Sequence, residues 1–187
     1  MAEKRKSWNG LMSGFKASDL VFLDESGCNT DMTRRYAYSL GGSRAVDSAP
    51  LSKPKNTTIL SSIQLDGTLR YTTFSGGTTV ERFKRFLETD LLPHLNGNSV
   101  LIMDNMKSHH AKAVKNLPDS SGIRYIYLPP YSPDLNPIEK LWSKVKAFLR
   151  KFKARTLDTL PDAIQHAFQN VSPSNCSGWF RSCGYAL

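Results

Sequence analysis

The sequence predicts a single domain of the α/β class, and three features support that fold class. The chain of 187 residues is long enough for one ordinary domain with a hydrophobic core. Hydrophobic residues make up 40% of it and charged residues 22%, which is typical of a globular protein rather than a disordered one. After a polar start, apolar segments typical of strands come first and then alternate with amphipathic segments typical of helices.

The first part of the chain predicts a set of antiparallel strands. We expect strands over residues 20–23, 35–40, 57–64 and 69–74. The first strand is an apolar run that ends at Asp24, so its carboxyl end presents an acid. Asp66 and Gly67 separate the last two strands and favour a tight hairpin turn.

The rest of the chain alternates helices and strands. Thr78 and Thr79 are favourable N-cap residues for a helix that ends near Pro93. We then expect a strand over residues 99–103, a helix over 109–116, a strand over 123–128, a proline-rich loop over 129–133 and a last helix from residue 159 or 160 to 170.

The longest predicted helix follows the proline-rich loop. Asn136 is expected at its N-cap and Pro137 at its first position, and apolar residues recur on one stripe through Phe152. Glu139 lies off this stripe. Steps of three or four residues from Glu139 reach Ser143, Lys146, Arg150 and Lys153, so we expect one exposed face with an acid followed by basic residues.

The charge of the chain favours a polyanionic partner. Its 25 basic and 16 acidic residues give a formal net charge of +9, although charge alone does not choose between nucleic acid and an anionic membrane. The sequence has neither an apolar run long enough to span a bilayer nor the apolar core of a signal peptide, so we expect a cytoplasmic protein without a membrane partner. Three cysteines without a C-x-x-C pair predict reduced thiols rather than disulfides or a zinc site.

Three acids occupy positions from which one active site could form. Asp24 and Asp104 each follow an apolar strand, and Glu139 lies in the first turn of a helix. The carboxyl ends of strands in an open α/β sheet border the crevice in which ligands bind. Clustered carboxylates raise one another's pKa values unless a cation lies between them, and their oxygens suit Mg²⁺ or Mn²⁺. Two such ions can support cleavage of a phosphodiester.

Each acid also has a purely structural interpretation. The helix dipole favours Glu139 at a helix N-terminus, Asp24 can be an ordinary residue at a strand end, and Asp104 with Asn105 can form a turn. The residue pattern alone leaves these alternatives open.

Three blocks of the sequence resemble the mariner-like superfamily of DDE transposases, and in particular its bacterial insertion-sequence branch. They are VFLDESG at 21–27, LIMDNMKSHH at 101–110 and YLPPYSPDLNPIEKLWSKVK at 127–146. The resemblance implies that Asp24, Asp104 and Glu139 are the catalytic, metal-binding triad. It also implies a ribonuclease H-like fold with a mixed central sheet flanked by helices, two Mg²⁺ or Mn²⁺ ions, cleavage at transposon ends and strand transfer into target DNA in the nucleoid.

The resemblance also divides the chain into regions. We expect residues 1–18 to be a basic tail or linker and residues 19–187 to be the catalytic domain. Members of the family carry an N-terminal helix-turn-helix region, which the residues before Leu20 are too few to form. We therefore expect the catalytic portion of a split or truncated transposase, which associates with itself or with a separate helix-turn-helix portion.

Further residues are candidates for contacts with DNA or with the site. The expected phosphate contacts are Lys146, Arg150, Lys153, Arg34 and Arg35. Asn105 and His109 are expected near the acids, although His109 can equally have a structural role. We expect Trp142 in the core rather than stacked on a base, and His94, His110 and His166 on the surface.

Two other functions remain as alternatives. A decayed element could encode a catalytically idle protein that binds DNA, but the intact acids count against it. A different ribonuclease H-like nuclease could share the acids, but the proline-rich third block counts against that alternative.

Overall fold

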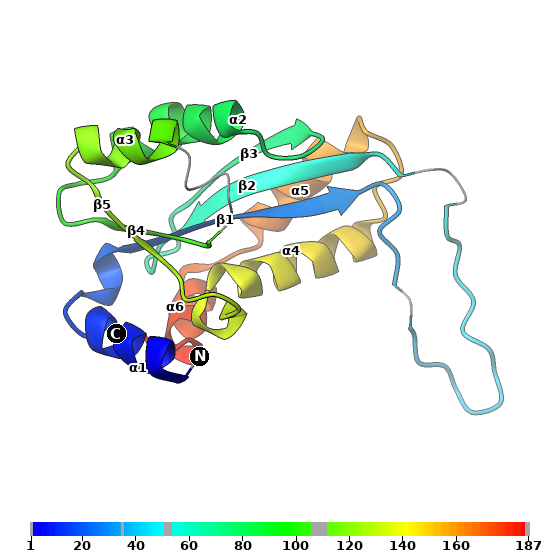
Figure 1. The fold of residues 1–187 in the computed structure, drawn as a ribbon. Helices are drawn as coiled ribbons and strands as arrows, with labels where there is room; N and C mark the ends of the chain where they lie inside the picture. The colour runs from blue at the N-terminus through cyan, green and yellow to red at the C-terminus, as the bar shows by residue number, and fades with distance from the viewer. Residues whose placement is uncertain (1, 35, 51–53, 106–111, 186–187) are drawn as a thin grey trace.

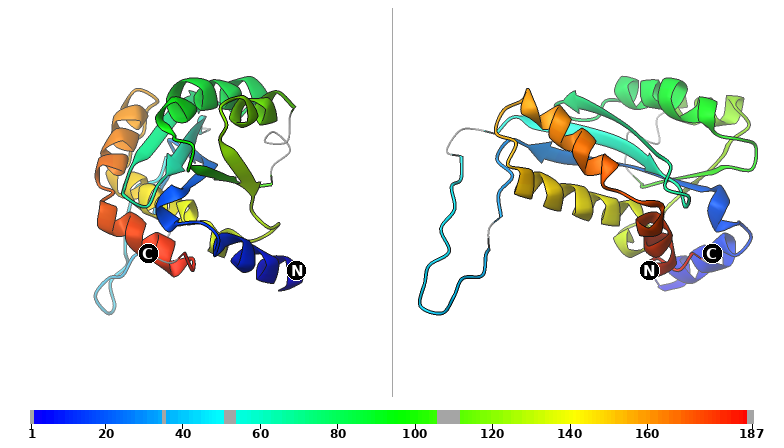
Figure 2. Two further views of the ribbon diagram at one scale, coloured as in Figure 1. Left: turned by 90° about the vertical axis from the view of Figure 1, so that its left-hand side faces the viewer. Right: turned by 180° about the vertical axis from the view of Figure 1, so that it is seen from behind.

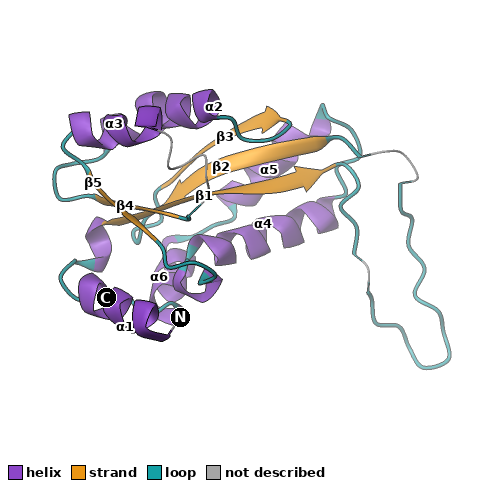
Figure 3. Ribbon diagram, viewed as in Figure 1, coloured by secondary structure: helices purple, strands orange, loops and turns teal. Residues whose placement is uncertain are grey.

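The computed structural model describes residues 2–34, 36–50, 54–105 and 112–185. Its centre is a five-stranded sheet with the strand order β3-β2-β1-β4-β5 (Figures 1 and 3). The strands are β1 (Leu20–Asn29), β2 (Asn56–Ile63), β3 (Leu69–Ser75), β4 (Val100–Met103) and β5 (Arg124–Tyr127). Strand β1 pairs with β2 in antiparallel and with β4 in parallel orientation, so the sheet is mixed, as the resemblance implied.

Helices cover both faces of this sheet (Figure 2). They are α1 (Ala2–Met12), α2 (Val80–Arg85), α3 (Lys112–Ser120), α4 (Ile138–Phe152), α5 (Thr159–Gln169) and α6 (Pro173–Ser182). Helices α2 and α3 lie on one face, and α1, α4, α5 and α6 lie on the other. Among the described residues, none of these helices is long and apolar enough to cross a membrane.

Alternating side chains of the central strands supply two separate hydrophobic clusters. In β1, Leu20 and Phe22 are buried in the cluster that contains α4, α5 and α6. Val21 and Leu23 point to the other face and are buried in the cluster with α2 and α3. The sheet is therefore covered on both faces around residues 20–23 of β1 and around β4, which explains why these two segments are continuous apolar runs.

The predicted hairpin is confirmed. Strands β2 and β3 pair in antiparallel orientation from Thr57 with Ser75 to Ile63 with Leu69. The backbone N–H of Gln64 donates to the carbonyl of Thr68 at 3.1 Å, which closes the turn. Gly67 adopts a φ of 93°, a left-handed conformation that favours glycine.

The predicted helix after Thr79 is also confirmed, with a change in its last turns. The Thr79 side chain accepts a hydrogen bond from the backbone N–H of Arg82 at 3.3 Å, as expected for an N-cap. Beyond α2 the chain continues as a π-helical segment, η2 (Phe86–Leu91), and a short 3₁₀ turn, η3 (Leu92–His94). Pro93 in this turn cannot continue an α-helix, which accounts for the expected end.

The strand expected over residues 35–40 is wrong. Residues 36–40 have no regular secondary structure, and Arg35 lies outside the described residues. Tyr36, Tyr38 and Leu40 are almost fully exposed, so their weak alternation does not correspond to a buried face. This stretch belongs to a long loop between β1 and β2 that projects from one end of the sheet (Figure 1).

Two helices were not expected from the sequence. We expected a tail or linker over residues 1–18, but the structure forms α1 there and buries Trp8 and Met12 in the cluster beside α4. Helix α6 begins with a capping box in which Ser172 and Asn175 exchange hydrogen bonds, and it buries Phe180. In both helices few apolar residues reach the core, so helical periodicity is weak in the sequence.

Replacing Gly67 with alanine should destabilise the protein. The left-handed φ is strained for any side chain, and a Cβ would stand 3.0 Å from the backbone Cα of Pro173 at the start of α6. We expect Gly67→Ala to lower the free energy of unfolding by more than about 1 kcal/mol in urea titrations. Gly97→Ala is the control because its Cβ would have no atom within 4 Å. Equal stability of the two variants would contradict the prediction.

Candidate active site

Strand pairing places two of the three acids side by side. The parallel ladder between β1 and β4 ends with the pair Leu23 and Met103, and the next residues of the two strands are Asp24 and Asp104. We had expected strand β1 to end at Asp24, but it continues to Asn29 in its pairing with β2. Strand β4, the parallel neighbour of β1, ends at Met103. Asp24 therefore lies inside β1, whereas Asp104 lies just beyond the end of β4.

Side-chain alternation turns both acids toward the same face. Phe22 of β1 and Ile102 of β4 are buried in the cluster that contains α4. Asp24 and Asp104 lie two residues further along these strands, and side chains two residues apart share a face. The acids therefore follow the apolar residues on which α4 packs.

Helix α4 brings the third acid to the same place. Glu139 lies in the first turn of α4 and is exposed. Asp24, Asp104 and Glu139 all line one cavity of about 650 Å³. Asn105, Asn136 and Lys146 line it as well, together with the proline-rich loop.

The start of α4 differs by one residue from the prediction. The helix begins at Ile138, and Pro137 precedes it with helical backbone angles. The Asn136 side chain does not cap the helix, and its buried Oδ1 has no hydrogen-bond partner in the structure. A 3₁₀ turn, η5 (Pro133–Leu135), runs directly into this junction. The backbone N–H of Asn136 donates to the carbonyl of Pro133, so this turn fixes the residue before the helix begins.

Asp24 is the acid whose protonation the fold changes most clearly. Its side chain is 7% exposed. The pKa of Asp24 is raised from 3.8 to about 7, chiefly by burial and in smaller part by the nearby carboxylates of Asp104 and Glu139. Two hydrogen bonds oppose this effect, one from the backbone N–H of Glu25 to Oδ1 at 2.8 Å and one from the Trp142 indole N–H to Oδ2 at 3.2 Å.

Trp142 was expected in the core, and the structure does bury it, with 3% of its surface exposed. Its hydrogen bond to Asp24 was not expected. Sequence spacing places Trp142 on the apolar stripe of α4 but carries no information about the polar group that its N–H meets across 118 positions of the chain.

The donor set of the cavity fits a divalent cation. Within the described residues, no three His, Cys, Asp or Glu side chains are close enough together to bind one ion. Mg²⁺, however, commonly takes only one or two carboxylates and completes its shell with water and phosphate. Oxygen donors are what Mg²⁺ and Mn²⁺ prefer, and a bound cation would offset both the burial and the carboxylate repulsion that raise the pKa of Asp24.

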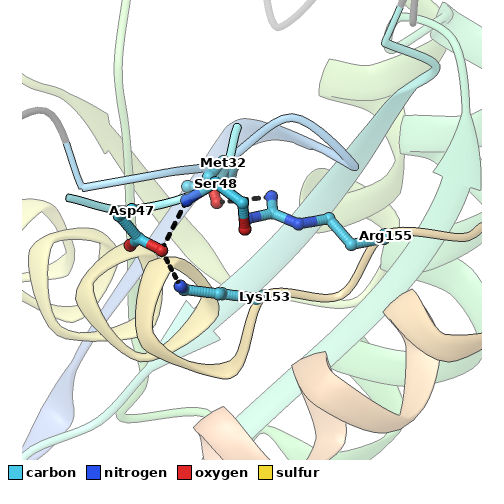
Figure 4. Close-up of polar contacts among 5 residues, drawn as sticks. All are labelled: Met32, Asp47, Ser48, Lys153 and Arg155. Atoms are coloured by element: carbon cyan, nitrogen blue, oxygen red, sulfur yellow. Dashed lines mark hydrogen bonds and ion pairs between the residues drawn. The ribbon is translucent and has the colours of Figure 1, made fainter. Parts of the chain in front are cut away.

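The basic residues of α4 occupy different surroundings. Lys146 lines the cavity, two helical turns beyond Glu139. Arg150 is half-buried one turn further along. Lys153 lies just past the helix with a left-handed φ of 57°, and its ammonium group forms an ion pair with Asp47 of the long loop (Figure 4).

Arg155 is a second basic residue that contacts this loop, close to the end of β1. The guanidinium of Arg155 donates to the carbonyl of Met32 at 3.2 Å (Figure 4). Arg34 lies in this loop and is exposed.

The expected site residues Arg35 and His109 lie outside the described residues, as does His110, while His94 and His166 are exposed as expected.

The raised pKa of Asp24 should make the stability of the metal-free chain depend on pH. In the unfolded chain this carboxyl ionises near pH 3.8, whereas in the folded chain it keeps its proton until about pH 7. Between these values the folded state binds more protons, so the free energy of unfolding falls as the pH rises. Asp24→Asn should remove this part of the decline in urea titrations, and Asp162→Asn, an exposed control on α5, should not. Parallel curves for wild type and Asp24→Asn would show that the pKa is not raised.

Solved structures with the same fold are transposases. The protein chain of a pre-cleavage Mos1 transpososome is 19% identical, with a TM-score of 0.80 over 96% of this chain and 58% of that chain. The Mos1 mariner paired-end complex with Mn is also 19% identical, with a TM-score of 0.73 over 96% and 58%. The catalytic domain of Mos1 mariner transposase is 15% identical, with a TM-score of 0.66 over 96% and 85%. At these identities the likeness concerns the fold, and it confirms the expected ribonuclease H-like arrangement.

The chain thus spans less than two thirds of the length of the chains in the Mos1 complexes with transposon ends. A comparison with curated proteins finds no match. The family model described as DDE superfamily endonuclease matches residues 19–161, and this range contains all three acids of the cavity. Because the match covers most of the chain, the protein belongs to the DDE superfamily of endonucleases.

Proposed function

We propose that this chain is the catalytic portion of a mariner-like transposase, which cleaves DNA at transposon ends and joins the ends to target DNA. The observation that carries the proposal is the meeting of Asp24, Asp104 and Glu139 in one cavity. Membership of the DDE endonuclease superfamily and the fold shared with Mos1 transposase support it. The Mos1 relatives were solved in complexes with transposon ends and in a strand transfer complex.

The three acids would hold the metal ions. Asp24, Asp104 and Glu139 are the proposed ligands of Mg²⁺ or Mn²⁺, and Mos1 complexes with each of these metals have been solved. Two bound ions would activate the attacking water or 3′-hydroxyl and stabilise the leaving oxygen of the phosphodiester. Burial of Asp24 keeps water away from this carboxylate, so its charge acts strongly on groups inside the cavity.

Basic side chains would position the DNA backbone. Lys146 places a positive charge inside the cavity that also holds the acids, where a phosphate would lie. Arg150 extends this charge along α4, while Lys153 and the exposed Arg34 are candidates for outer contacts. Such contacts fix the position of DNA without reading its sequence. Recognition of the ends would then need a helix-turn-helix portion, and pairing of two ends would need self-association.

Cleavage should require both a divalent metal and each of the three acids. We expect nicking of DNA with Mg²⁺ or Mn²⁺ and none in excess chelator. Asp24→Asn, Asp104→Asn and Glu139→Gln should each reduce nicking by more than about 100-fold. Replacing a group that only hydrogen-bonds to a metal ligand already costs about 10- to 100-fold, and the loss of the ligand itself should cost more. DNA affinity should be unchanged in gel-shift measurements.

The structural interpretation of Glu139 forecasts a different result. A helix-terminal carboxylate without a catalytic role would change stability by at most about 1 kcal/mol and leave nicking intact. A wild-type nicking rate in Glu139→Gln would therefore remove this residue from the site. Inactivity of the wild-type chain with every metal would instead favour the catalytically idle alternative.

Binding to DNA should depend on salt and not on sequence. Each phosphate contact contributes about 0.9 to the slope of log affinity against log salt, so replacing Lys146 and Arg150 with glutamine should lower that slope by up to about two units. Lys84 and Arg85 of α2, on the opposite face of the sheet, provide the matched control pair. Fluorescence anisotropy on terminal-repeat and scrambled duplexes measures both effects. A preference above about 100-fold for the repeat would place sequence recognition within this chain.

A further inference from the structure

The Asp24 carboxylate is held by one hydrogen-bond donor on each oxygen. The backbone N–H of Glu25 donates to Oδ1 at 2.8 Å, and the indole Nε1–H of Trp142 donates to Oδ2 at 3.2 Å. A carboxylate held on both oxygens cannot rotate without breaking one of these bonds. Since a carboxylate can accept about four hydrogen bonds, each oxygen still has capacity for a further partner.

Trp142 connects this carboxylate to the helix that carries the third acid. It lies three residues after Glu139 in α4, so the two side chains are neighbours on the surface of the helix. Trp142 is 3% exposed and lines the same cavity as both acids. The helix therefore supplies both an acid of the site and the donor that fixes another acid.

An indole is well suited to orient a metal ligand. Its N–H only donates, and it carries no charge. A lysine or arginine in this position would neutralise Asp24 and would compete with a cation for the carboxylate. The Trp142 donor orients Asp24 and leaves its negative charge available.

We propose that Trp142 is a positioning residue of the active site, which holds the Asp24 carboxylate in the orientation needed to bind a divalent cation. The inference rests on the proposed function, because it assumes that Asp24 is a metal ligand. Groups that hydrogen-bond to metal ligands typically change metal affinity or activity by about 10- to 100-fold when they are replaced. The Trp142 indole N–H belongs to this class of groups.

The spectroscopic test uses the indole N–H of the unmodified side chain. The chain has three tryptophans, so a ¹⁵N-labelled sample gives three indole N–H signals in NMR spectra. Trp8→Phe and Trp179→Phe variants assign the remaining signal to Trp142. Addition of Mg²⁺ should shift the Trp142 signal, because a cation bound to Asp24 withdraws electron density from the carboxylate oxygen that accepts the indole hydrogen bond. The Trp179 signal should stay in place.

The variant test removes the donor and keeps an aromatic ring. Calorimetry should show that Trp142→Phe binds Mn²⁺ about 10- to 100-fold more weakly than wild type, and that Trp179→Phe, a partly buried control, binds it normally. The Mn²⁺ concentration for half-maximal nicking should rise in the same proportion, with DNA affinity unchanged. If Trp142 had a purely structural role, Trp142→Phe would lower the stability of the protein without weakening Mn²⁺ binding selectively.

The possible outcomes separate the two levels of the argument. If wild type binds neither Mg²⁺ nor Mn²⁺, the proposed function fails, and the role of Trp142 fails with it. If wild type binds metal but Trp142→Phe binds it equally well, only the role of Trp142 is overturned. If Trp142→Phe does not fold, the NMR titration of wild type decides, and a Trp142 signal that metal leaves unmoved overturns the inference.

Discussion

The parallel pairing of β1 with β4 is the interaction on which the geometry of the site depends. It registers Leu23 with Met103, so Asp24 and Asp104 follow the last paired residues at the same level of the sheet. A slip of one residue in β4 would turn Asp104 to the opposite face and separate the two acids. The register is fixed because both faces of these strands are buried, and a slip would expose apolar side chains of either cluster. Core packing thus determines the position of the acids.

The same packing places Asp24 where its charge is unfavourable. The carboxylate is buried near two other acids, and this arrangement raises its pKa to about 7. Such a group weakens the folded state at neutral pH, and the apolar clusters on both faces of the sheet offset that loss. Violations of ordinary packing rules of this kind concentrate at functional sites. The unfavourable burial of Asp24 therefore supports a functional role for this residue. The purely structural interpretation of the acids does not explain why such a burial would be kept.

The sequence predicts best those features that depend on neighbouring residues. The turn at Gly67 and the cap at Thr79 are local, and the structure confirms both. It also brings the three acids into one cavity, as strand ends and a helix start suggested. Features that depend on distant partners were missed: α1 becomes a helix by burying Trp8 against the rest of the fold, and the carboxylate that meets Trp142 is fixed by tertiary packing. Local patterns carry no information on such partners.

Helix α4 unites the core, the site and the long loop in one rigid element. Its apolar stripe packs on the sheet, its N-terminal half presents Glu139 and Lys146 to the cavity, and the residue that ends it, Lys153, pairs with Asp47 of the loop. A rigid helix cannot move one of these groups without moving the others. Because Trp142 bonds to Asp24 from the helix that also carries Glu139, this hydrogen bond links the helix of the third acid directly to the strand of the first.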